Sequence, residues 1–255
     1  MQAMYAILDG VTCQLQLPSP QSQLLPGVQW GSFDELLTPA YWKGQAWQHE
    51  RLGSYEELRL GRSLIEELAA CLLGGYGMPA ELGLAAYRRL RDRGLLGAVP
   101  TVDALEGALS EPFATRHGVT RRYRFPRQKA RYLAGCLQAI QDLAPPRSDR
   151  ALRDLLMELP GIGPKTASWV VRNHRGSDAV AIIDVHILRA GRHIGLFPAS
   201  WQPRQHYVQL ESAFLKFAVA LDVRASLLDA MIWDYMRRLP PMSAPHKHAV
   251  SSAAA

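Results

Sequence analysis

Two residues able to do chemistry, Lys165 and Asp184, stand at the starts of two successive predicted helices. Lys165 follows the run PGIGP at 160–164, which ends one helix and places a proline where the next would begin. Asp184 follows an apolar run at 179–183, and its carboxylate is expected to cap a third helix. A neutral lysine amine is a nucleophile, and a carboxylate stabilises a developing positive charge. The pair therefore predicts nucleophilic chemistry assisted by an acidic residue.

The elements around Lys165 form a helix–hairpin–helix. Residues 151–159 show the apolar spacing of one helix, and an apolar face continues in the helix that begins at Pro164. The glycines between them let backbone N–H groups approach an anion closely, and the following helix N-terminus adds its positive dipole end. A DNA phosphate suits such a site. We therefore predict DNA contacts at the hairpin through Gly161, Ile162, Gly163 and Thr166.

Four stretches carry a resemblance to a known family. LPGIGPKTA at 159–167 and IIDVHILR at 182–189 together resemble the helix–hairpin–helix superfamily of DNA glycosylases. QKARYLAGCLQAI at 128–140 and LLDAMIWDYM at 227–236 are similar to helices of the 8-oxoguanine DNA glycosylase/AP lyase branch. That branch is the expected placement of this chain within the superfamily.

The resemblance implies that Lys165 is the catalytic nucleophile and Asp184 the catalytic aspartate of a base-excision repair enzyme. The lysine amine would attack C1′ of the damaged nucleotide and displace its base, and β-elimination from the Schiff base would nick the strand. The expected lesion is an oxidised purine, with 8-oxoguanine foremost. Two alternatives stay open: the same fold removing an alkylated or otherwise modified base without cleavage, and a non-catalytic DNA-binding module. Lys165 and Asp184 argue against the module, because phosphate binding through backbone groups needs neither side chain.

The resemblance also bears on cofactors. Endonuclease III relatives usually carry an iron–sulfur cluster on four cysteines after the last helix, whereas this chain has no cysteine after Cys136. Cys13, Cys71 and Cys136 are scattered and are expected to be reduced core residues. His246 and His248 are too few for a metal site, which needs three or four ligands. We expect no cofactor and no bound metal, and the one ion that the family would bring is a monovalent cation at the hairpin.

Composition favours a DNA-binding protein with a packed core. The 255 residues are 48% hydrophobic and carry a formal net charge of +6. The densest basic run is 121–132, where Arg127, Lys129 and Arg131 are expected to contact the DNA backbone. His186 is predicted either to reach a phosphate or to bond the start of its own helix. The expected partner is double-stranded DNA that contains a damaged base.

The sequence also bears on location. It contains no run of about 18 apolar residues long enough to span a membrane. Residues 1–10 lack the basic segment and long apolar segment of a secretory leader. We expect a cytoplasmic monomer without a membrane partner, associated with the nucleoid if the source is bacterial.

Several side chains are candidates to contact an extruded base. The candidates for the pocket or for a wedge in the duplex are Trp42, Gln45, Trp47, Tyr76, Met78 and Trp233. The cluster at 42–47 offers stacking faces and amide edges, although core packing explains its aromatics equally well. In the stretch 74–78, an apolar wedge competes with a plain glycine-rich helix stop, which we prefer for the individual side chains.

The predicted fold is mainly α: a helix–hairpin–helix DNA glycosylase fold of two helical subdomains with a cleft. A small N-terminal β-hairpin is expected at 4–17, because Asp9-Gly10 suits a tight turn between alternating residues. The spacings Ser32–Glu35 and Ser54–Glu57 predict helix starts. The expected divisions are the hairpin and linker at 1–31, a helical subdomain at 32–144 completed by part of the C-terminal helices, the helix–hairpin–helix subdomain at 145–240, and a disordered tail at 241–255.

Overall fold

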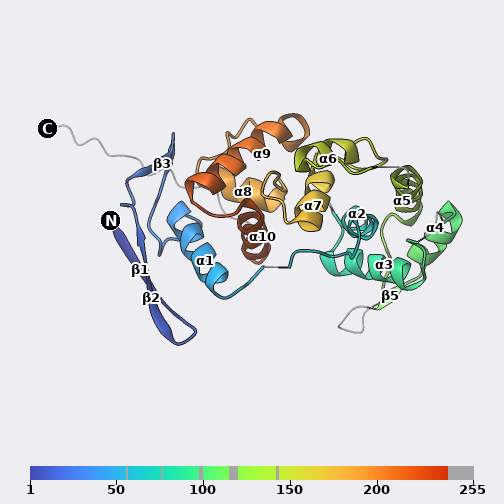
Figure 1. The fold of residues 1–255 in the computed structure, drawn as a ribbon, viewed down its shortest axis with the longest axis horizontal. Coiled ribbons are helices and arrows are strands. Elements are labelled where there is room, and N and C mark those ends of the chain that lie inside the picture. Colours follow the sequence, from blue (N-terminus) through green and yellow to red (C-terminus); the bar gives the residue numbers. More distant parts are fainter. Residues whose placement is uncertain (56, 76, 98–99, 115–119, 142–143, 241–255) are drawn as a thin grey trace.

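The computed structural model describes residues 1–240 except 56, 76, 98–99, 115–119 and 142–143. The described residues form ten α-helices and three antiparallel two-stranded pairs, so the mainly α prediction is confirmed (Figure 1). The helices are α1 (Pro39–Arg51), α2 (Leu64–Leu73), α3 (Ala80–Asp92), α4 (Val102–Ser110), α5 (Pro126–Ile140), α6 (Asp149–Leu156), α7 (Pro164–Arg175), α8 (Val185–His193), α9 (Pro203–Ala220) and α10 (Ala225–Met236). The strands are β1 (Gln2–Leu8), β2 (Val11–Leu17), β3 (Gln23–Leu25), β4 (Val28–Gln29), β5 (Phe113–Ala114) and β6 (Thr120–Arg121). The predicted tail at 241–255, with its two histidines, lies outside the described residues.

The first two helices begin later than their capping-box spacing predicted. Thr38 caps α1 by accepting from the N–H of Tyr41 at 3.1 Å, and Ser63 caps α2 by accepting from the N–H of Glu66 at 3.2 Å. The segment before α2 is held in another way, because the N–H groups of residues 60 and 61 donate to the buried Glu67 carboxylate at 2.9 and 2.8 Å. A carboxylate only six and seven residues further along therefore holds this segment, and α2 begins at Leu64 instead of near residue 54.

The helices divide between two hydrophobic cores. The first core contains residues from all six helices from α2 through α7. The second core contains residues from α1, α8, α9 and α10. In Figure 1, α7 stands between these two groups of helices. Along the chain, the change from one core to the other falls between Val180 and Ala181, and the division expected at residue 145 stays a prediction. A cleft between two subdomains stays a prediction.

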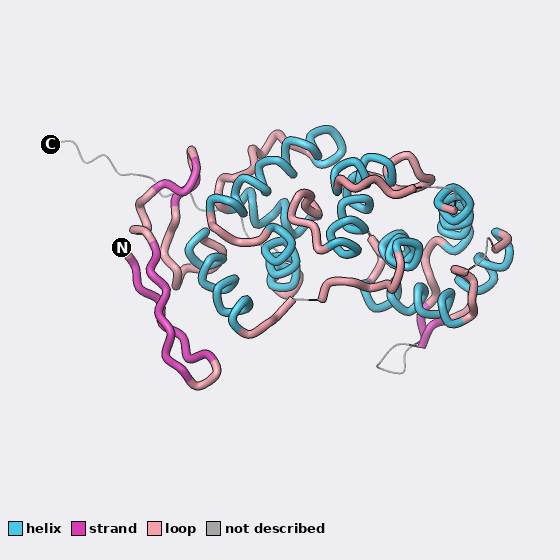
Figure 2. The backbone as a smooth tube through the Cα atoms, viewed as in Figure 1, coloured by secondary structure: helices cyan, strands magenta, loops and turns pink. Residues whose placement is uncertain are grey.

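The N-terminal hairpin forms where the sequence predicted it. In β1–β2, Gln2 pairs with Leu17 and Leu8 pairs with Val11, and the turn between them has positive φ at both Asp9 and Gly10. The Gln2 side chain ties the open end of the hairpin to the carbonyls of residues 18 and 31 at 2.8 and 2.9 Å. Figure 2 shows the hairpin as a strand pair at one end of a helical molecule. Among the described residues, no helix has both the length and the apolar character to cross a membrane.

Candidate active site

The hairpin between α6 and α7 is shaped by its glycines. Gly161 has a φ of +73°, and a Cβ there would overlap the ring of Tyr132 on α5. Ile162 is buried in the first core and anchors the turn to it. Gly163 faces open space, since a Cβ at that position would meet nothing within 4 Å. The outer side of the hairpin is therefore free to approach another molecule.

Backbone donors gather at the start of α7. Gly163 is its N-cap and supplies no side-chain cap, and Pro164 has no N–H to satisfy. Within the described part of the chain, the N–H groups of Gly163, Lys165 and Thr166 have no hydrogen-bond acceptor. Free N–H groups at a helix N-terminus form a ready anion site. Free backbone N–H groups therefore gather at the hairpin, where a DNA phosphate stays a prediction.

Lys165 and Asp184 occupy two helix starts, as predicted. Lys165 lies half-buried in the first turn of α7. Asp184 is only 9% exposed and caps α8, where its Oδ1 accepts from the N–H groups of His186 and Ile187 at 2.8 and 3.0 Å. Both residues are described, and they form no ion pair with each other within 4.0 Å. The Lys165 ammonium is therefore not paired with the Asp184 carboxylate.

An exposed tryptophan lies beside the helix that Asp184 caps. The rings of His186 on α8 and Trp233 on α10 meet edge to face, 6.5 Å apart between centroids. Trp233 is 37% exposed, and the guanidinium of Arg237 lies over its ring at 4.9 Å. The His186 side chain is half-buried, and its Nδ1 atom has no hydrogen-bond partner among the described residues. Trp233, one of the pocket candidates, therefore lies next to the helix that Asp184 caps and is partly exposed.

Trp42 is not available to stack on a base. Its side chain is fully buried in the second core, with Tyr41 and Tyr235 packed edge-on against its ring at 5.1 and 6.0 Å. Gln45 is also engaged, because its Oε1 accepts from the hydroxyl of Tyr235 at 2.7 Å. Trp47 is half-buried. Core packing, the other interpretation of this aromatic cluster, holds for Trp42.

Sequence reasoning missed the polar cluster that faces α1 from α10. Tyr235 bonds Gln45 and also lies 3.1 Å from His49 Nε2. Next to it, the hydroxyl of Tyr55 donates to Asp234 at 3.1 Å, and burial beside that carboxylate raises the pKa of Tyr55 to about 12. The available signal is the polar pair Asp234-Tyr235 within the stretch 227–236.

The stretch 74–78 begins as a helix stop. Gly74 is the C-cap of α2, and a Cβ there would lie 3.1 Å from the Trp169 ring on α7. Met78 packs against the first core, which does not suit a free wedge. Tyr76 lies outside the described residues.

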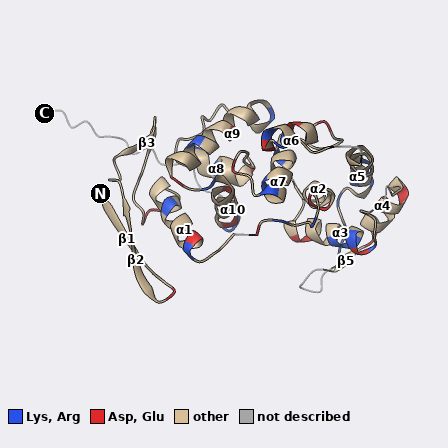
Figure 3. Cartoon of the chain, viewed as in Figure 1, with Lys and Arg blue, Asp and Glu red and all other residues tan. Residues whose placement is uncertain are grey.

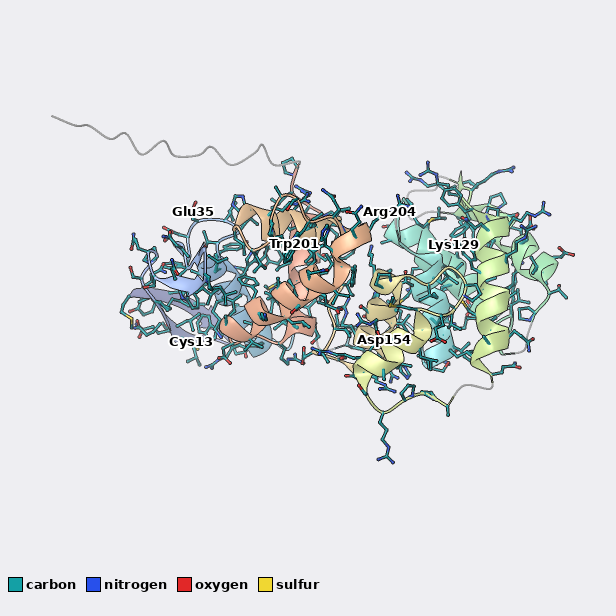
Figure 4. The ribbon with its side chains drawn as sticks, turned by 90° about the horizontal axis from the view of Figure 1, so that it is seen from above. Cys13, Glu35, Lys129, Asp154, Trp201 and Arg204 are labelled. Carbon is teal, nitrogen blue, oxygen red and sulfur yellow. The ribbon has the colours of Figure 1, made fainter. Side chains whose placement is uncertain are left out.

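The candidate DNA-contacting residues of the basic run at 121–132 differ in exposure: Lys129 is half-buried, whereas Arg127 and Arg131 are exposed. Lys129 points inward, where its ammonium donates to the carbonyl of Leu72 at 2.6 Å, and burial lowers the pKa of the amine. A phosphate contact by Lys129, which stays a prediction, would have to replace this bond, because the amine already caps the end of α2. Arg131 is exposed, and so is Arg127, which lies 3.9 Å from Glu106. Figure 4 shows Lys129 at the opposite end of the molecule from Cys13.

The inner face of α5 supports the hairpin, which sequence reasoning also missed. A Cβ on Gly135 would lie 3.0 Å from Pro160, and the Cys136 thiol lies 3.3 Å from the Pro160 carbonyl. Together with Tyr132 against Gly161, these contacts hold α5 against the turn.

The cysteines are free, and the described residues contain no group of three or more His, Cys, Asp or Glu side chains able to hold a metal ion.

Comparison with known proteins agrees with this geometry. The family model described as 8-oxoguanine DNA glycosylase matches residues 48–223. The chain belongs to this family. The 8-oxoguanine DNA glycosylase/AP lyase of Metallosphaera sedula is 32% identical over 189 residues, which are 70% of this chain and 86% of that protein.

Solved structures of the family resemble the fold. The 8-oxoguanine DNA glycosylase of Thermotoga maritima is 25% identical with a TM-score of 0.51, over 76% of this chain and 88% of that one. The enzyme of Methanocaldococcus jannaschii is 24% identical with a TM-score of 0.60, over 80% of this chain and 95% of that one. The family match begins at residue 48, so it does not include the N-terminal hairpin or most of α1.

Proposed function

We propose that this protein is a base-excision repair glycosylase with AP lyase activity that removes 8-oxoguanine from double-stranded DNA. One observation carries the proposal: Lys165 lies among free backbone N–H groups at the start of α7, while Asp184 is held at the start of the next helix. The family and the name of the Metallosphaera sedula relative support the same activity and lesion. A backbone-only DNA-binding module has no use for either side chain.

The proposed reaction assigns a role to each of the two groups. The neutral Lys165 amine attacks C1′, the bond from C1′ to the base breaks, and the departing base takes up a proton. One amine proton passes to the departing base and the other to O4′, so that the sugar ring opens to a Schiff base and a free hydroxyl. Loss of a C2′ proton then expels the 3′ phosphate by β-elimination. Asp184 is held through Oδ1, and its carboxylate stabilises the positive charge that develops on the sugar.

The DNA path follows from the exposed donors. The free N–H groups of Gly163, Lys165 and Thr166, next to Gly161 and Ile162 in the hairpin, bind one phosphate, and a monovalent cation at the hairpin carbonyls would add positive charge beside it. The exposed Arg127 and Arg131 contact the backbone further along, and His186 reaches a second phosphate. Trp233 offers its exposed face to the extruded base. The reaction needs no redox cofactor, and we place the protein as a monomer in the cytoplasm, at the nucleoid if the source is bacterial.

Borohydride trapping on a panel of duplexes, each with a single lesion, tests this proposal. A covalent adduct is expected on the 8-oxoguanine duplex, because borohydride reduces the Schiff base to a stable amine. Lys165→Gln should abolish the adduct and leave DNA binding nearly intact. Lys216→Gln, at an exposed lysine on α9, is the matched control and should trap like the wild type.

The other outcomes separate the alternatives. Clean base release without an adduct on any lesion would support the monofunctional glycosylase. Neither adduct nor base release, with DNA still bound, would support the binding module. An adduct that persists in Lys165→Gln would refute the assignment of the nucleophile.

A further inference from the structure

Residues 181–183, which lead into Asp184, are buried but lie in no strand or helix. Buried backbone N–H groups need acceptors, and here side chains from two other helices provide them. The N–H of Ala181 donates to Glu211 Oε1 at 3.1 Å, that of Ile182 to Asp229 Oδ2 at 3.3 Å, and that of Ile183 to the Tyr207 hydroxyl at 3.2 Å. Three consecutive N–H groups are thus held by α9 and α10.

Tyr207 holds the segment from both directions. Its hydroxyl accepts from Ile183 and donates to the carbonyl of Ala181 at 2.9 Å. The next residue, Asp184, donates its own N–H to the carbonyl of Ile182 at 3.0 Å. The backbone of Asp184 therefore has little freedom to shift.

The same two carboxylates also hold the helix that carries Lys165. Glu211 Oε1 accepts from the Ser168 hydroxyl on α7 at 3.0 Å, and its Oε2 accepts from Arg153 on α6 at 2.8 Å. Asp229 pairs with Arg172 on α7, with 3.2 Å between the closest nitrogen and oxygen. Each carboxylate thus contacts Asp184's segment on one side and Lys165's helix on the other.

These charges are expensive to bury for stability alone. Glu211, Asp229, Arg153 and Arg172 are all less than one-tenth exposed. Replacing a buried ion pair by apolar side chains of similar volume is often neutral or stabilising, so packing does not explain the charges. Directional hydrogen bonds, in contrast, fix the geometry between the groups that they join. Here the hydrogen bonds to Glu211 join the two segments that bear Lys165 and Asp184, and Asp229 joins them through one hydrogen bond from Ile182 and its ion pair with Arg172.

We infer that Glu211, Asp229 and Tyr207 are positioning residues that set the place of the Asp184 carboxylate relative to the Lys165 amine. We call the three side chains the 181–183 clamp. The inference rests on the proposed function, because it assigns the clamp to the step in which both groups act. The clamp side chains bond the protein's own backbone, and they act on the reaction only through Asp184 and Lys165.

Tyr207→Phe is the sharpest test, since it deletes one oxygen atom from the clamp. Misplacing catalytic groups by a fraction of an ångström is costly, so single-turnover base release should slow by about 10- to 100-fold, with an unchanged Kd for lesion DNA. Tyr87→Phe is the matched control in the first core, because its buried hydroxyl bonds Glu66 at 2.9 Å, away from both segments. It should lose a similar amount of thermal stability and keep the wild-type rate.

A double-mutant cycle distinguishes positioning from general loosening. If Tyr207 acts through Asp184, Tyr207→Phe should slow base release little further in an Asp184→Asn background. A full additional loss there would overturn the inference. Ser168→Ala is a second variant that favours helix formation and cuts only the link from Glu211 to α7. It should also slow base release without weakening DNA binding.

The failures are distinguishable. A wild-type protein that neither releases a base nor forms an adduct would refute the proposed function before the clamp is tested. A working wild type whose Tyr207→Phe and Ser168→Ala variants both stay within about twofold of its rate would refute the clamp alone.

Discussion

At the scale of single residues, burial has changed the chemistry of a carboxylate next to the proposed site. Asp229 is 2% exposed, and desolvation raises its pKa to about 6. Asp184 and Asp178 act in the same direction by like-charge repulsion, while Arg172 and the N–H of Ile182 oppose the shift. Keeping Asp229 ionised near neutral pH therefore lowers the free energy of unfolding.

The pH dependence of stability should show this cost. Because the pKa of Asp229 is higher in the folded chain than its ordinary value of 3.8, the folded state binds more protons between about pH 4 and pH 6. The contribution of Asp229 to the free energy of unfolding is fully present below that window and is lost as the pH rises through about 6. Denaturant midpoints at about pH 5 and about pH 7.5 measure it, and in Asp229→Asn this part of the difference should disappear.

A matched control keeps that result specific. Asp222→Asn changes an exposed carboxylate that pairs with Lys43 at the surface, and its midpoints should follow those of the wild type. Equal pH dependence in Asp229→Asn and wild type would contradict the assignment.

At the scale of elements, the hairpin has one glycine for its fold and one for its approach to DNA. Gly161 has a positive φ and lies against Tyr132, whereas Gly163 has a φ of −98° and an open side. The support comes from α5, whose inner face packs on the turn while its outer arginines stay exposed. We therefore expect one helix both to shape the hairpin and to offer charge to the DNA that binds there.

The two glycines should respond differently to substitution. Gly161→Ala should destabilise the protein by at least about 1 kcal/mol, through the left-handed backbone and the overlap with Tyr132, and should weaken DNA binding. Gly163→Ala should weaken DNA binding with little loss of stability, because its Cβ meets no protein atom but stands where an anion would approach. Melting curves and Kd measurements on the two variants check this. Equal losses of stability would be inconsistent with it.

At the scale of the whole molecule, the N-terminal hairpin stands apart from the rest in charge. Residues 1–42 contain no lysine or arginine, and Figure 3 shows no blue on the β1–β2 pair, whereas blue segments lie on the helices. The hairpin packs on α1 through contacts such as Met4 against Gly44. It lies at the opposite end of the molecule from α5 (Figure 1). We therefore expect it to contribute to stability and not to DNA binding.

Removing residues 1–17 tests this expectation. The truncated protein should melt at a lower temperature, because the buried side chains of Leu8 and Leu17 and the bonds of Gln2 are lost. Its Kd for lesion DNA and the salt dependence of that Kd should match those of the full chain, since no positive charge is removed. A weaker salt dependence would instead place the hairpin on the DNA path.

The sequence by itself determined the features that depend on neighbouring residues. The Asp9-Gly10 turn, the hairpin around Gly161 and Gly163, and the Asp184 cap all depend on backbone preferences within a few positions. The motifs of Lys165 and Asp184 also identified the family, because they occur together at a fixed spacing along one stretch of chain. Such signals can be read without knowing where any distant residue lies.

Only the tertiary structure decided which way the longer side chains face and which helices share a core. Trp42 lies buried beneath Tyr235, Lys129 turns inward to the carbonyl of Leu72, and α1 joins the C-terminal helices instead of its neighbour α2. The clamp on residues 181–183 likewise comes from side chains on α9 and α10, about 25 to 50 positions further along the chain. A local pattern is compatible with either face of a helix, and the choice depends on which apolar surfaces meet when distant segments pack together.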